Sequence, residues 1–172
     1  MKPNADIERV ANYFRLIYLN GIPPTITDAS AYLSFICTFC ALEALAGYRY
    51  GPKVGKGKRF QDLIGAYFPP CYKGVESQLW QLRNSMVHAF SASHFELTHN
   101  HSEQHFKQRN NRLVLDSQSF YEEMKAAAEK YFAEMALSPD RQRVFGEYIN
   151  SENGGLTVGP GLAGIVVTGG LW

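Results

Sequence analysis

The feature that most constrains this fold is a run of almost uninterrupted apolar residues from position 31 to position 46. A helix of about 16 residues falls short of the roughly 20 residues that cross a bilayer. Glu43 lies inside the run, and a carboxylate is costly in lipid. The run therefore predicts a central helix surrounded by other elements of a folded protein, with no membrane partner.

Composition is typical of a globular chain. The protein has 172 residues, of which 45% are hydrophobic, enough for one domain with a real core. Its 17 basic and 16 acidic residues leave a net charge of +1, so any nucleic-acid binding must come from a local patch. Three cysteines are too few for a secreted disulfide scaffold. The N-terminal residues lack the apolar core of a signal peptide, and we expect a cytoplasmic protein.

Apolar spacing and the positions of Pro and Gly predict an all-α fold, a bundle of five or six helices. The predicted helices cover residues 6–19, about 28–50 with Asp28 in the first turn, 60–68, 75–92, 119–136 and 139–150. Thr25 or Thr27 is the predicted cap of the second helix, and Ser119 with Glu122 forms a predicted capping box. Alternation between 94 and 116 predicts a small β-hairpin turning at 108–111. Residues 1–150 form the predicted domain, and residues 151–172 a Gly-rich tail that is poorly folded or adds a strand to a partner surface.

Residues 79–90 (LWQLRNSMVHAF) are the most informative stretch of the chain. On a helix its apolar side chains form one stripe: Leu79, Leu82, Met86 and Phe90. Polar side chains occupy the opposite side: Gln81, Asn84 and His88, with Arg83 at the flank. Asn84 and His88 are one turn apart and can touch. From spacing alone, Arg83 could equally be a solvated surface residue and His88 a satisfied, partly buried one.

The segment Arg83-Asn84-Ser85-Met86-Val87-His88 resembles the R-x4-H motif of HEPN domains (higher eukaryotes and prokaryotes nucleotide-binding). The resemblance covers roughly residues 6–137 and implies a HEPN-like helical bundle that forms a homodimer with facing motif helices. For many members it also implies metal-independent RNA cleavage without a cofactor. Arg83 would brace the phosphate and His88 would act as general base or acid. Asn84 would orient His88 or contact phosphate.

The resemblance also implies a biological setting and an alternative. Such endoribonucleases act on RNA in toxin–antitoxin, stress or phage-defence systems, with an antitoxin or regulatory protein as partner. Toxins paired with a nucleotidyltransferase often carry a tyrosine two residues after the histidine, where this chain has Phe90. Some HEPN proteins do not cleave. The alternative function is therefore a non-catalytic module that binds a nucleotide, RNA or a protein.

A basic loop supplies the second candidate site. Lys53, Lys56, Lys58 and Arg59 form the densest basic patch and could attract an RNA backbone, or could simply be a solvated mobile loop. The spacing of glycines around it does not fit a phosphate-binding Walker loop.

Three further groups are weaker candidates. Four histidines (His94, His99, His101 and His105) could reach one metal, but they fit a mobile His-rich hairpin better, and we predict no metal site. Cys37 and Cys40 fit buried small side chains. Glu43 needs a partner if buried; we expect Arg83, Arg59 or a hydrogen bond from the motif helix, unless it points to solvent.

Overall fold

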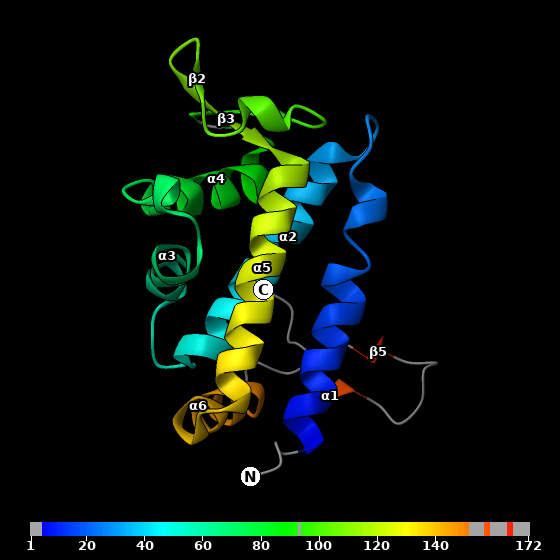
Figure 1. Cartoon of the computed structure of the whole chain (residues 1–172), viewed down its shortest axis with the longest axis vertical. Helices are drawn as coiled ribbons and strands as arrows, with labels where there is room; N and C mark the ends of the chain where they lie inside the picture. The colour runs from blue at the N-terminus through cyan, green and yellow to red at the C-terminus, as the bar shows by residue number, and fades with distance from the viewer. Residues whose placement is uncertain (1–4, 93, 152–156, 159–164, 167–172) are drawn as a thin grey trace.

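Six α-helices account for most of the computed structural model, which describes residues 5–92, 94–151, 157–158 and 165–166 (Figure 1). The helices are α1 (Ala5–Phe14), α2 (Ala31–Tyr50), α3 (Lys56–Tyr67), α4 (Glu76–Ala89), α5 (Ser117–Ala136) and α6 (Pro139–Ile149). The prediction of a mainly helical fold is confirmed.

The predicted central helix is α2, which packs against α3, α5 and α6. Figure 1 shows α5 crossing in front of α2, with α1 on one side and α3 and α4 on the other. Among the described residues, α2 alone is long and apolar enough to cross a membrane, and 56% of that stretch is buried inside the protein. Such burial is typical of a core helix.

The first predicted helix continues from α1 into a wider π-helical turn, η1 (Arg15–Leu19). A Cβ on Gly21 would lie 2.1 Å from the carbonyl oxygen of Ile17, so a glycine is required where the chain leaves this turn. The short 3₁₀ helix η2 (Pro23–Thr25) then leads toward α2.

The predicted caps of α2 are wrong. The helix begins at Ala31, several residues after Thr25 and Thr27. The hydroxyl of Thr25 donates to the carbonyl oxygen of Ile22 at 2.6 Å, and that of Thr27 lies 2.6 Å from the Ser30 hydroxyl. Both threonines therefore close the preceding turn, because their hydroxyls find nearer partners there.

The predicted hairpin is only partly correct. The sheet has the order β1 (Phe95–Thr98), β3 (Arg112–Asp116), β2 (Gln108–Arg109). β1 pairs with β3 in parallel, Phe95 opposite Leu113, so these two strands cannot be the arms of a hairpin. The hairpin joins β2 to β3 through Asn110 and Asn111, whose φ angles of 51° and 61° suit a tight two-residue turn. The crossover between β1 and β2 contains η4 (Ser102–Gln104).

The last two helices begin with side-chain caps. The predicted capping box at Ser119 is wrong: Asp116 caps α5 and accepts the backbone N–H of Ser119 at 3.0 Å. Ser138 caps α6 directly before Pro139, close to the predicted start. In the predicted tail, β4 (Thr157–Val158) pairs antiparallel with β5 (Ile165–Val166). The remainder of residues 152–172 lies outside the described residues.

Candidate functional site

The helix α4 carries the motif and has the predicted two faces. Leu79, Leu82 and Met86 are fully buried, whereas Asn84 is half-buried and His88 is exposed. The predicted stripe is wrong at Phe90, because α4 ends at Ala89 and Phe90 takes a left-handed conformation with φ of 48°. This reversal turns the ring outward and leaves it 82% exposed.

Arg83 forms an ion pair with Glu43 of α2. Arg83 Nη2 lies 2.6 Å from Glu43 Oε2, and the two side chains are only 16% and 17% exposed. Nη1 of Arg83 also donates to Asn84 Oδ1 at 3.2 Å, and the guanidinium lies over the Trp80 ring at 5.6 Å. The prediction that Arg83 is a partner of Glu43 is confirmed. The guanidinium is thus held from three sides in one position.

His88 lies in the last turn of α4 with its imidazole exposed. Within residues 5–92 and 94–151 no group hydrogen-bonds this ring, and the amide oxygen of Asn84 is used by Arg83. The structure therefore brings Arg83, Asn84 and Glu43 together. It places His88 on the same helix, one turn beyond Asn84 and open to solvent.

Arg59 does not belong to the exposed basic loop. Its side chain is buried, 3% exposed, and its guanidinium reaches the Gly51 carbonyl oxygen and the Tyr148 hydroxyl, each at 3.4 Å. It also lies over the Tyr148 ring at 5.0 Å. The prediction that Arg59 contacts RNA is therefore wrong. Arg59 instead joins the start of α3 to α6.

The three lysines of the predicted patch remain accessible. Lys53, Lys56 and Lys58 are exposed, but helix α3 begins at Lys56, earlier than predicted. Lys58 forms an ion pair with Asp62 one turn later, so part of its charge is neutralised. The loop thus offers two exposed lysines and a third that is already paired.

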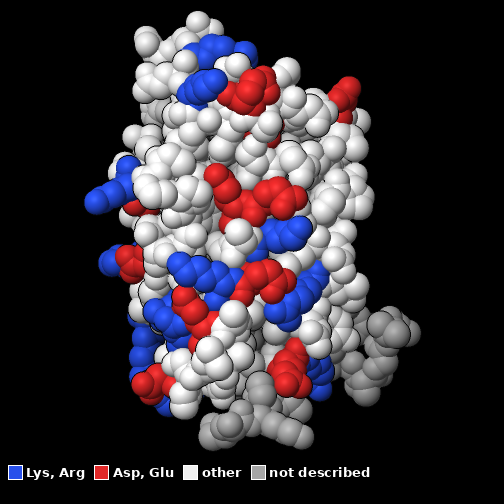
Figure 2. All heavy atoms as spheres, viewed as in Figure 1, with Lys and Arg blue, Asp and Glu red and all other residues white. Residues whose placement is uncertain are grey.

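Charged side chains of both signs share the face of the molecule drawn in Figure 2. Figure 2 shows Lys and Arg interleaved with Asp and Glu on the viewed face, most densely over its lower half. A surface with mixed signs produces no broad attractive field for a polyanion. An RNA contact on this viewed face would therefore rely on particular side chains rather than on a basic surface.

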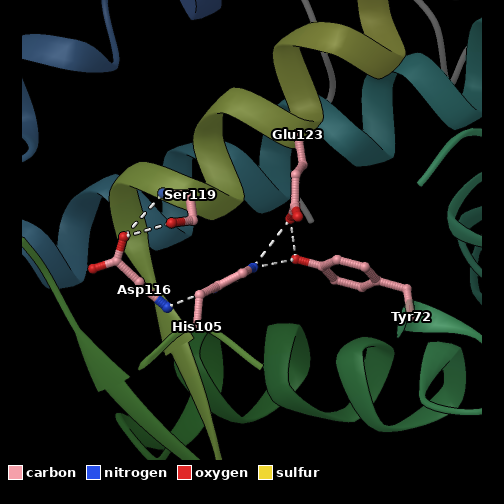
Figure 3. Close-up of polar contacts among 5 residues, drawn as sticks. All are labelled: Tyr72, His105, Asp116, Ser119 and Glu123. Carbon is pink, nitrogen blue, oxygen red and sulfur yellow. Dashed lines mark hydrogen bonds and ion pairs between the residues drawn. The ribbon is translucent and has the colours of Figure 1, made fainter. Parts of the chain in front are cut away.

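A buried polar network that the sequence did not reveal joins the sheet to the bundle (Figure 3). Tyr72 donates to Glu123 Oε2, and His105 Nε2 lies 3.2 Å from the same oxygen. His105 Nδ1 accepts the backbone N–H of Asp116 at 3.0 Å, so the ring proton is on Nε2. Burial and the Glu123 charge raise the pKa of Tyr72, which keeps its hydroxyl a donor. The Asp116 carboxylate in turn caps α5 at Ser119.

This network is structural rather than catalytic. Tyr72 is 1% exposed and the His105 side chain 9%, so a substrate cannot reach the reactive atoms. The network satisfies polar groups at the point where the segment from β1 to β3 (residues 95–116, the β-insertion) lies on η3 (Pro70–Tyr72) and α5. No local sequence pattern could have identified it, because its members come from three separate segments.

The remaining histidines and cysteines do not gather. His99 pairs with Asp28 and His101 with Glu103, and the described residues contain no group of three or more ligands that could hold a metal ion. Burial raises the pKa of the half-buried Cys37 thiol, and that of Cys40, so both remain protonated on α2.

Comparison with protein-family models, curated proteins and solved structures gives no match to this chain. The geometry of α4 and its surroundings therefore carries the functional argument. The most distinctive chemical feature there is an arginine fixed by a carboxylate, five residues before an exposed histidine.

Proposed function

We propose that this protein is a HEPN-like, metal-independent endoribonuclease that acts as a homodimer in the cytoplasm. Its role would be in a toxin, stress or phage-defence system, under the control of an antitoxin or regulatory protein. The observation that carries the proposal is the contrast between Arg83, which Glu43 holds in place, and His88, which is exposed on the same helix.

The chemistry suits these two side chains. The ribose 2′-hydroxyl attacks its own phosphate, so the O2′–P bond forms and the P–O5′ bond breaks. One imidazole acts as general base and takes the proton of the 2′-hydroxyl. A second group acts as general acid and gives a proton to the leaving 5′-oxygen. Arg83 stabilises the negative charge that develops on the phosphate. The products are a 2′,3′-cyclic phosphate and a 5′-hydroxyl, and no protein nucleophile is needed.

Exposure of His88 supports the catalytic function over the binding function. A general acid or base must reach the reacting proton, and a ring without a partner among the described residues is free to do so. Pairing with Glu43 does not remove Arg83 from consideration, because a preorganised guanidinium loses less freedom when it meets the phosphate.

The homodimer follows from the count of proton-transferring groups. Each chain contributes one histidine to the motif, whereas the reaction needs a base and an acid. Two copies related by a twofold axis would supply both.

His88→Ala and wild type, compared on mixed single-stranded RNA in the presence of EDTA, test the proposal. We expect wild type to yield 2′,3′-cyclic phosphate ends and His88→Ala to lose at least about a hundredfold in rate. His101→Ala is the matched control, because its imidazole is also exposed but lies in the β-insertion. Equal rates for wild type and His88→Ala would refute the catalytic function.

The non-catalytic alternative has one observation in its favour. Glu43 and Asn84 already engage Arg83, which limits the charge that it can offer to a phosphate. If wild type binds RNA without cutting it, and His88→Ala binds equally well, the binding module is the better description.

A further inference from the structure

An exposed aromatic ring, stacked on a half-buried tyrosine, follows the motif histidine in the chain. Phe90, two residues after His88, stacks on Tyr32 of α2 with ring centroids 5.8 Å apart and an interplanar angle of 15°. The Phe90 ring is 82% exposed. One face of the Phe90 ring packs on Tyr32, so the rest of this ring lies open to solvent two residues after the exposed His88.

The pair is held in place rather than left loose. The Tyr32 hydroxyl donates to the Met86 carbonyl oxygen at 3.2 Å, which ties its ring to the last turns of α4. The backbone N–H of Phe90 donates to the carbonyl oxygen of Ser85, closing the helix end. Tyr32 also lines a cavity of about 150 Å³ with Phe35 and Leu97, so the apolar surface continues past the stack.

The backbone conformation makes phenylalanine an unexpected residue at this position. A left-handed helix end normally carries glycine or asparagine, because a bulky side chain is strained there. An outward ring in a strained conformation contributes little to the core. A ligand that uses the ring face would account for an exposed ring in this conformation.

We propose that Phe90, backed by Tyr32, is a stacking platform for an unpaired base of the RNA next to the phosphate at His88. This inference rests on the proposed function and adds a binding element to it: an aromatic ring that holds one unpaired base of the substrate. Aromatic rings bind unpaired bases of any sequence by stacking, whereas a duplex keeps its bases stacked on each other.

Phe90→Gly is the sharpest test, because glycine accepts the left-handed conformation and the variant should melt no lower than wild type. In a His88→Ala background, which prevents cleavage, fluorescence anisotropy would measure binding of a labelled 12-nucleotide single strand and of a duplex of equal length. We expect Phe90→Gly to weaken single-strand binding about tenfold and to leave duplex binding unchanged. Phe90→Trp should restore the affinity.

Leu137→Ala is the matched control, since Leu137 is 87% exposed at the far end of α5 and should not affect binding. If Phe90→Gly bound the single strand as tightly as the His88→Ala protein that still has Phe90, the platform would be overturned. An equal loss of affinity for the duplex and the single strand would overturn it too. Conversion of a dimer to a monomer by Phe90→Gly in analytical ultracentrifugation would identify the ring as a subunit contact instead. Loss of cleavage in His88→Ala with unaltered binding in Phe90→Gly would refute the platform alone.

Discussion

The ion pair between Arg83 and Glu43 offers the most direct test of how the motif is held. Replacing Glu43 with Gln keeps the size of the side chain and removes its charge, and the Arg83 side chain, only 16% exposed, then lacks its counter-ion. Hydrogen bonds to charged groups contribute about 1.5–3 kcal/mol, so we expect a loss of about 2 kcal/mol in the free energy of unfolding. For a domain of this size that corresponds to a melting temperature about 4–8 °C lower.

A double-mutant cycle separates the pair from its surroundings. Glu43→Gln, Arg83→Gln and the double variant would be unfolded in urea at pH 7 and followed by circular dichroism. We expect a coupling energy of at least about 1 kcal/mol between the two side chains. The exposed pair of Arg143 and Glu147 is the control, and Glu147→Gln should cost at most about 0.5 kcal/mol. Additive effects of the two motif variants, within about 0.5 kcal/mol, would refute the reasoning.

Three further predictions concern stability and can be measured by thermal or urea unfolding. Gly47→Ala should cost about 1–3 kcal/mol, because its Cβ would lie 2.2 Å from the buried Tyr148 ring; an unchanged melting temperature would contradict this contact. Asp116→Ala should cost about 3 kcal/mol, since this fully buried carboxylate accepts backbone N–H groups from the β-insertion and from α5. Burial by itself would raise the pKa of Glu134. The hydrogen bond from Tyr67 and the charge of Arg141 in α6 outweigh burial and hold this pKa below its usual value of 4.5. The folded state therefore favours the carboxylate, so stability present above about pH 4.5 should fall as the pH drops further, and Glu134→Gln should flatten that decline.

The helices were the most predictable part of the fold. Apolar residues at helical spacing, with Gly and Pro between the runs, are local properties, and they located α2, α5 and α6 well. The ends were less certain. The cap of α5 is Asp116 rather than Ser119, because a buried carboxylate that also binds the β-insertion outcompetes a hydroxyl.

The candidate site was predictable where it depended on one helix. The pattern from Leu79 to His88 indicates a buried stripe and a polar face, and Arg83 is one of the partners that the sequence predicts for Glu43. Arg59 shows the limit of this reasoning: four basic residues in a glycine-containing loop look alike in sequence, yet one of them is buried under Tyr148.

The spacing of apolar and polar residues along the chain was enough to determine the helical class, the burial of α2 and the two faces of α4. Tertiary packing decided the parallel pairing of β1 with β3, the burial of Arg59 and the meeting of Tyr72, His105 and Glu123. Helix periodicity arises between residues three or four positions apart, whereas these contacts join residues 18 to 89 positions apart. Their partners are chosen by how the whole chain closes on its core, which no short stretch of sequence encodes.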